Sequence, residues 1–181
     1  MKYLIIFFAI SFTTIPVVAT EWLTVADYTQ IDLDSIEPYR DNNGNILEDK
    51  FVYWVKKKNN GSYIFSTLEN AYKKKIGYFM DKEVADCKLK KFDIRSNYIY
   101  DYNSKLIYRF DNPDYRQDWH SIVPESSEYA VFNEVYKYKL KYDEEQKKKA
   151  EEEALKAKQK AEEELNFNNP PQSQQQRNIK R

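Results

Sequence analysis

The sequence predicts an α+β domain: an antiparallel β-sheet of about five to six strands, with a C-terminal α-helix packed on one face. Two observations predict this fold class. Before Pro124 apolar and polar residues alternate, as they do in half-buried strands. After Pro124 the apolar spacing becomes helical, through Tyr129, Phe132, Val135, Tyr136 and Leu140. The chain therefore orders its strands first and one helix last.

The first strands are expected at Trp22–Ala26, Tyr28–Leu33 and Phe51–Val55. Phe51–Val55 is apolar on both faces, which indicates a central strand. Turn-forming residues at 41–45 and 59–62 bound the strand region on either side of it. Between Ser66 and Tyr78 the alternation weakens, so an irregular stretch or a short strand is expected there.

A further strand is expected where Ala85, Cys87 and Leu89 alternate with charged residues, which puts Cys87 on an apolar face. A β-hairpin should follow, with a tight turn at Asn103-Ser104. One face of its first strand is predicted to carry Phe92, Ile94, Tyr98, Tyr100 and Tyr102, and the other Asp93, Arg95, Asn97 and Asp101. Its second strand shows Leu106, Tyr108 and Phe110 opposite Lys105 and Arg109.

The C-terminal helix should begin near Pro124 and Ser126. Composition then divides the chain into a domain over residues 20–138, a Lys/Glu/Ala-rich helical tail over 139–165 and an Asn/Gln/Pro-rich tail over 166–181, expected to be disordered. Glu-to-Lys pairs four residues apart support the charged helix. Its apolar stripe of alanines and two leucines is too thin for a convincing coiled coil.

The N-terminal residues 1–19 have the pattern of a secretory signal peptide. Lys2 gives a positive start, Leu4–Phe12 is an uncharged apolar run, and Val17 and Ala19 stand at the two positions a signal peptidase reads. Cleavage is expected before Thr20. The alternative is a membrane anchor, but the apolar stretch is interrupted before the roughly 20 residues needed to span a bilayer. The mature chain is expected in the periplasm or outside the cell, with no stable membrane span.

Charge and composition argue against several chemistries. The chain has 29 basic and 29 acidic residues, so it lacks the basic excess of a nucleic-acid binder. Basic clusters at 56–58, 73–75 and 88–91 are expected at solvated strand ends and turns. No group of residues has metal-ligand spacing and no Gly-rich phosphate loop occurs, so neither a metal nor another cofactor is expected. No catalytic residue is assigned.

Two single residues require separate treatment. Cys87 is the one cysteine, so it cannot form an internal disulfide; it is a buried thiol, an intermolecular bridge or a reactive thiol. The strand-face position favours burial. His120, the one histidine, follows Trp119 and has no acid–base partner by motif, which favours a packing role near the helix start.

The high content of aromatic residues is the feature of the composition that points most directly to binding. The 16 tyrosines exceed what a core of this size requires. Tyrosine suits binding surfaces because it buries a large area at low entropic cost and keeps a polar tip. The candidate binding residues are therefore Tyr98, Tyr100 and Tyr102 on one sheet face, with Trp119 and His120.

Three stretches in order carry a family resemblance: Trp22–Ala26 leading into Tyr28–Ile36, the strand Val52–Lys56, and Asp86-Cys87 followed by a hairpin and Trp119–Ser126. They resemble the surface-adhesin protein E family of exported bacterial proteins. The resemblance covers residues 22–138 and implies an antiparallel sheet with a C-terminal helix. Its founding member is an outer-membrane adhesin that binds host matrix proteins, so the resemblance implies an adhesin-like role.

The chain departs from that family in three ways. Tyr136 stands where relatives often carry a second cysteine, so the bridge from Cys87 is missing. Pro124-Glu125 replaces the Pro-Gly that often precedes the helix. The signal sequence ends without a cysteine, so there is no lipid attachment site.

Two functions are consistent with these observations. The first is an exported, non-catalytic binding module that presents a tyrosine-rich sheet face to a protein partner. The second is a periplasmic envelope structural factor whose charged tail acts as a spacer or tether.

Overall fold

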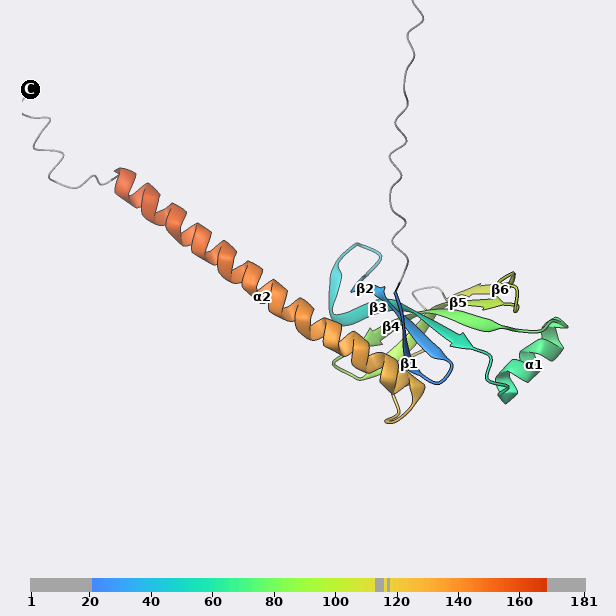
Figure 1. Cartoon of the computed structure of the whole chain (residues 1–181). Helices are drawn as coiled ribbons and strands as arrows, with labels where there is room; N and C mark the ends of the chain where they lie inside the picture. The colour runs from blue at the N-terminus through green and yellow to red at the C-terminus, as the bar shows by residue number, and fades with distance from the viewer. Residues whose placement is uncertain (1–20, 113–115, 117, 169–181) are drawn as a thin grey trace, which may run out of the picture.

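The computed structural model describes residues 21–112, 116 and 118–168, and its centre is one antiparallel sheet (Figure 1). Six strands pair in chain order, and a short seventh strand pairs with the fifth. The strands are β1 Trp22–Ala26, β2 Thr29–Arg40, β3 Ile46–Lys58, β4 Tyr78–Asp86, β5 Lys91–Tyr100, β6 Leu106–Asp111 and β7 His120–Ser121. The helices are α1 Tyr63–Tyr72 and α2 Ser127–Asn168. The predicted signal peptide and residues 169–181 lie outside the described residues.

Local hydrogen bonds explain why the strands form a meander. At the β2–β3 turn the Asp41 carboxylate accepts the backbone N–H groups of Asn43 and Asn45, both at 2.9 Å. At the β5–β6 turn Asp101 does the same for Asn103 and Lys105, at 2.8 and 2.9 Å. These Asx turns reverse the chain within a few residues, so successive strands become neighbours.

Helix α1 corrects the expectation for residues 66–78. Phe65, Leu68 and Tyr72 recur at helical spacing, and Lys73 ends the helix in the left-handed conformation at φ 53°. Phe65 and Leu68 pack against Phe79 of β4, with Phe65 stacked on Phe79 at 4.4 Å between ring centroids. The chain therefore has a helix between its strands as well as one after them.

Both helices pack on the same face of the sheet, at different ends of it (Figure 1). Under α2 the core is formed by Ile31, Phe51, Tyr53, Val55, Ala85, Cys87, Val131, Phe132 and Val135. Under α1 a second core is formed by Phe65, Ile76, Phe79 and Ile99. The face that carries both helices is called the helix face below.

A β-bulge in β5 corrects the predicted pattern of its faces. Ile94 pairs with Glu83 and Ser96 pairs with Lys82, so Arg95 is an extra residue between them. Because one added residue inverts the side-chain alternation, Phe92 and Ile94 share one face while Tyr98 and Tyr100 lie on the other. Asp93 and Arg95, expected on a solvated face, are 1 % and 6 % exposed.

Cys87 lies just beyond β4, not within a strand that continues to Leu89. The strand ends at Asp86, and residues 87–90 form the turn to β5. Leu89 is 62 % exposed, whereas Cys87 is buried in the core under α2. The turn therefore buries the thiol. The backbone N–H of Cys87 donates to the Asp49 carbonyl at 2.8 Å.

Helix α2 begins as the sequence predicts. The Ser126 hydroxyl accepts the backbone N–H of Tyr129 at 3.1 Å, which is an N-cap. The helix then runs without a break past residue 139 to Asn168, and every residue from 143 to 165 is exposed. Among the described residues, neither helix is both long and apolar enough to cross a bilayer.

Candidate binding site

The face of the sheet opposite the helices carries a cluster of aromatic and cationic side chains. Register places Tyr78 beside Tyr100, Met80 beside Tyr98, and Tyr98 beside Arg109. The aromatic face is defined here by Trp54, Lys56, Tyr78, Tyr98, Tyr100 and Arg109, from strands β3 to β6. Neither described helix packs on it, because both belong to the helix face.

Ring contacts hold the aromatic face in a defined arrangement. Tyr78 and Tyr100 are stacked with centroids 4.8 Å apart, and Trp54 lies 5.6 Å from Tyr98. Lys56 Nζ sits 4.3 Å from the Tyr78 ring centroid. The Arg109 guanidinium lies 5.2 Å from the Tyr98 ring. These cation–π contacts and stacks restrict the rings before any partner arrives.

A hollow of about 330 Å³ adjoins the aromatic face. Its lining includes Tyr39, Val52, Lys82, Arg95 and Asp111. Arg95 lies 5.5 Å from the Tyr39 ring centroid and its Nη1 is 3.4 Å from Asp93 Oδ2. The hollow gives this side of the sheet a recess beside Lys82 and Asp111.

The structure separates the five candidate residues inferred from sequence. Tyr98 and Tyr100 lie together on the aromatic face, near the end of β5. Tyr102 lies past the strand in the turn, 67 % exposed, where its hydroxyl accepts the Asn59 side-chain amide at 3.3 Å. His120 pairs with Phe92 at the start of β5, so Trp119 and His120 lie at the other end of that strand.

Trp119 and His120 have contacts of their own. Lys50 Nζ lies 4.8 Å from the Trp119 ring centroid. The His120 ring contacts Phe92 at 5.5 Å, and His120 Nε2 is 3.7 Å from the Asp118 carboxylate. Trp119 directly precedes the short strand β7, and His120 begins it with an exposed side chain.

Sequence reasoning missed Trp54, Lys56, Tyr78 and Arg109. Each belongs to a strand, but only the pairing register shows that all four border Tyr98 and Tyr100. Cross-strand neighbours come from segments more than ten residues apart, so alternation within one strand does not reveal them.

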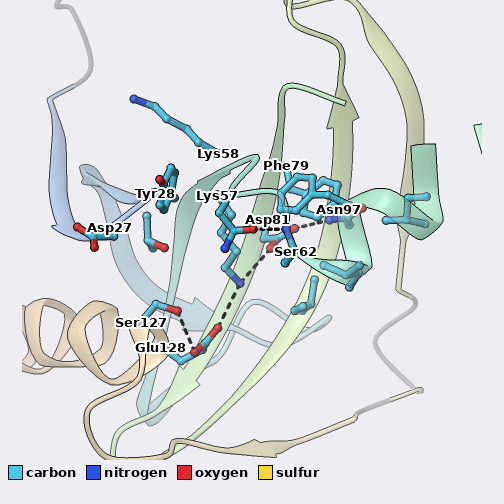
Figure 2. A pocket seen from close by; sticks show the side chains of 16 residues that line it. Asp27, Tyr28, Lys57, Lys58, Ser62, Phe79, Asp81, Asn97, Ser127 and Glu128 are labelled. Atoms are coloured by element: carbon cyan, nitrogen blue, oxygen red, sulfur yellow. Dashed lines mark hydrogen bonds and ion pairs between the residues drawn. The ribbon is translucent and has the colours of Figure 1, made fainter. Parts of the chain in front are cut away.

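A second candidate site is a cavity on the helix face. It has a volume of about 520 Å³ and lies between α1 and the first turn of α2 (Figure 2). One wall is apolar, from Ile64, Phe65, Leu68 and Phe79. The remaining lining is largely polar and includes Asp27, Lys57, Asp81, Asn97 and Glu128.

The floor of this cavity is formed by part of an ion cluster: Lys57, Asp81 and Glu128 line the cavity, and Glu83 completes the cluster from outside the lining. Lys57 Nζ lies 2.9 Å from Glu83 Oε1, 3.2 Å from Asp81 Oδ2 and 3.9 Å from Glu128 Oε1. The Asn97 amide donates to the other oxygen of Asp81. The side chains of Asp81 and Glu83 are only 3 % and 2 % exposed. Lys57, expected at a solvated strand end, is thus the centre of a largely buried cluster.

Burial and charge shift the pKa values in this cluster. Desolvation raises the pKa of Glu83, and the Lys57 ammonium opposes that rise. Desolvation acts to lower the pKa of Lys57, but the Glu83 and Asp81 carboxylates outweigh it and the pKa is raised. Lys57 is therefore a permanent cation at neutral pH.

Within the described part of the chain, no three His, Cys, Asp or Glu side chains are grouped in a way that holds a metal ion.

Comparison with known proteins gave one solved structure. The chain is similar to the crystal structure of protein E from non-typeable Haemophilus influenzae, a member of the family that the sequence motifs resemble. The two share 15 % sequence identity over 70 % of this chain and 80 % of that chain, with a TM-score of 0.43. No family model matches the chain, and no curated protein matches it in sequence.

Proposed function

We propose that this protein is an exported, non-catalytic binding module that engages a protein partner through its aromatic face. The observation that supports the proposal is the set of rings and cations on a sheet face that neither described helix covers. Tyrosine, tryptophan and arginine are the residue types enriched among those that dominate binding energy at protein interfaces.

Preorganisation strengthens the proposal. Ordering a flexible side chain on binding costs roughly 0.5–1.5 kcal/mol. The Tyr78–Tyr100 and Trp54–Tyr98 contacts have already restricted four of these side chains in the free protein. Their burial by a partner therefore carries little additional entropic cost.

Charge indicates the kind of partner surface. Lys56, Lys82 and Arg109 lie on this part of the face, and Asp111 pairs with Arg109 at 2.6 Å. The adjoining hollow adds the cation Arg95 and the acid Glu37. Because both signs of charge are present, we expect a partner surface that carries apolar groups together with charges of both signs. A standard interface takes about 800 Å² from each partner, which requires the adjoining hollow as well as the aromatic face.

Site-specific photo-crosslinking tests the proposal in cells of the source organism. A photoreactive residue at position 82 borders the aromatic face, and one at Lys137 lies on the exposed side of α2. We expect a discrete protein adduct from position 82 and none from position 137. The same adduct from both positions, or from 137 alone, would place the contact elsewhere.

Substitutions on the aromatic face measure how much it contributes to the affinity for the partner. Tyr78→Ala or Trp54→Ala should weaken binding of the crosslinked partner at least tenfold, as expected when a central aromatic residue is truncated. Tyr136→Ala, a substitution of a tyrosine that is 40 % exposed on α2, is the matched control and should leave affinity unchanged. Equal losses in all three variants would exclude the aromatic face.

Helix α2 supports a second candidate, a periplasmic envelope structural factor. Its 42 residues span about 63 Å, and the portion beyond residue 142 accounts for about 39 Å of that length. Such a charged rod suits a spacer or tether. Cell fractionation separates the two functions: surface labelling or release into the medium favours adhesion, and co-sedimentation with the envelope favours the structural role.

A further inference from the structure

The cavity on the helix face lies between the two hydrophobic cores. The core under α2 and the core under α1 are separate clusters, and Lys57, Asp81 and Asn97 occupy the sheet positions beside the gap. Charged side chains with under 5 % exposure, such as Asp81, are rare in sheets unless they are paired. The site is therefore a cavity with a built polar floor rather than a gap between loops.

The ion cluster has more negative than positive charge. Three carboxylates, Asp81, Glu83 and Glu128, surround the single Lys57 ammonium. One carboxylate is enough to neutralise a buried lysine, and each additional buried carboxylate carries a desolvation cost. Asp27 adds another acidic group to the lining. Among the residues that line the cavity, three acids, Asp27, Asp81 and Glu128, therefore face two cations, Lys57 and Lys58, which leaves an excess of one negative charge.

An anionic ligand fits this floor poorly. The Lys57 ammonium already has a carboxylate within 4 Å in three directions, which matches its three donors. Lys58, the other cation of the lining, is exposed and extends away from the cluster (Figure 2). The charge complement of this cavity is thus a cation.

The apolar wall defines the rest of the ligand. Ile64, Phe65 and Leu68 of α1 face the acidic side formed by Glu128 and the sheet floor. The side chain of Ile64 is 57 % exposed, so this wall is open to contact. A ligand with one charged end and one apolar stem satisfies both walls at once.

We infer that this cavity binds an organic cation, an ammonium or guanidinium group carried on an apolar stem. Lysine and arginine side chains of a peptide have this chemistry, and so do free aliphatic amines. The inference goes beyond the proposed function, because the cavity and the aromatic face lie on opposite sides of the sheet.

Isothermal titration of the full chain tests the inference with defined probes. Nα-acetyl-L-arginine amide and Nα-acetyl-L-lysine amide represent peptide side chains, and cadaverine represents a free amine. Nα-acetyl-L-norleucine amide is the neutral isostere of the lysine probe. We expect saturable binding of at least one cationic probe, no saturable binding of the norleucine probe, and an affinity that falls as salt rises. Which cationic probe binds identifies the source.

Variants place the binding in the cavity. Glu128→Gln removes one carboxylate from a partly exposed side chain and should weaken binding roughly three- to tenfold. Glu134→Gln is the matched control and should have no effect. It removes another α2 carboxylate that pairs with a lysine, in this case Lys137, away from the cavity. Asp27→Asn removes a second lining carboxylate, from the β1–β2 turn, and should also weaken binding of the cationic probe. A folding defect in one variant therefore does not decide the result.

Three outcomes would overturn the inference. They are no saturable binding by any cationic probe at millimolar concentration, equal binding of the norleucine probe, and equal losses from Glu128→Gln and Glu134→Gln. Tyr78→Ala should leave cation binding intact, so failure here and failure of the proposed function are distinguishable.

Discussion

At the scale of the residue, Gly77 shows how closely two backbone segments approach. A Cβ at this position would lie 2.7 Å from the Asp101 carbonyl oxygen and 3.0 Å from the Tyr102 Cα, both backbone atoms. The Gly77 N–H also donates to the Tyr100 carbonyl at 2.8 Å. The entry of β4 beside the end of β5 therefore requires a residue without a side chain.

Gly77→Ala should destabilise the domain by about 1–3 kcal/mol, because backbone has to move to accommodate the methyl group. Gly44→Ala is the comparison, since its Cβ would meet nothing within 4 Å and only the cost of φ +83° remains. Urea denaturation of both variants measures the difference. A smaller loss for Gly77→Ala than for Gly44→Ala would contradict the close approach.

Lys56 and Lys57 are adjacent in sequence and lie on opposite faces of β3. Lys57→Met leaves the Asp81 and Glu83 carboxylates buried without their cation, which should cost about 3–5 kcal/mol. Lys56→Met removes a cation–π contact on a half-buried surface and should cost under about 1 kcal/mol. The free energy of unfolding at pH 7 checks the contrast.

The deficit of Lys57→Met should shrink as the pH falls from 7 toward the ordinary pKa range of a glutamate. Desolvation already raises the pKa of Glu83, and loss of the Lys57 ammonium raises it further, so its carboxylate takes up a proton in that window. A deficit that is constant with pH would mean that packing of the lysine stem, rather than charge, stabilises the cluster.

Cys87 is predicted to be a structural thiol. Burial raises its pKa from 9.0 to about 12, so little thiolate is present at neutral pH. Native labelling by thiol reagents should be slow and labelling in denaturant fast. Cys87→Ser should cost about 1–3 kcal/mol if the hydroxyl finds no partner. Rapid native labelling, or a Cys87-linked dimer on a non-reducing gel, would contradict this role.

The raised thiol pKa also predicts how the stability of the domain changes in alkaline solution. The folded state favours the protonated thiol, so its contribution to stability is complete below about pH 9 and is lost as pH rises toward 12. The stability difference between the wild-type chain and Cys87→Ala should therefore narrow between pH 9 and 11.

At the scale of the element, α2 has two parts with different roles. Its first turns contribute Val131, Phe132 and Val135 to the core, and Tyr138 and Tyr142 contact Phe51 edge-on at 5.9 and 5.7 Å. From residue 143 onward every described side chain is exposed. The apolar contacts with the sheet thus end at Tyr142, although the helix does not.

Truncation after Tyr142 should leave the melting temperature within a few degrees, which corresponds to under about 1 kcal/mol for a domain of this size. Truncation after Lys137 also removes both tyrosine rings and should cost roughly 2–4 kcal/mol. Differential scanning calorimetry of the two chains measures this. Unfolding of the longer truncated chain would show that the exposed part of α2 supports the domain.

At the scale of the whole molecule, one sheet separates two surfaces with different chemistry. The helix face holds both cores and the acidic cavity, and the opposite face holds the aromatic residues and their cations. Because alternate residues of each strand supply the two faces, substitutions on one face change the other little.

Export is the prediction that concerns the whole chain. The N-terminal pattern of Lys2, Leu4–Phe12 and Val17-Val18-Ala19 should direct secretion and cleavage. N-terminal sequencing of the mature protein should therefore begin at Thr20. An intact Met1 on a membrane-integrated protein would contradict it.

Much of the fold is determined by local sequence. Alternation locates the strands, the Asp41 and Asp101 turns set the meander, and Ser126 caps α2, since each of these features depends on residues within one turn or strand. The spacing of Phe65, Leu68 and Tyr72 also contains the signal for α1. The expectation of an irregular stretch or a short strand there was wrong, because the weak alternation reflects helix α1.

The two candidate sites were decided by tertiary structure. The bulge at Arg95 moves Tyr98 and Tyr100 to the face opposite Phe92, and pairing register then brings them beside Trp54 and Tyr78. Likewise, Lys57 meets Asp81, Glu83 and Glu128 only because strand pairing and the docking of α2 join segments 24 or more residues apart. Local propensity acts along the chain, whereas these clusters depend on contacts across it, which only the folded sheet establishes.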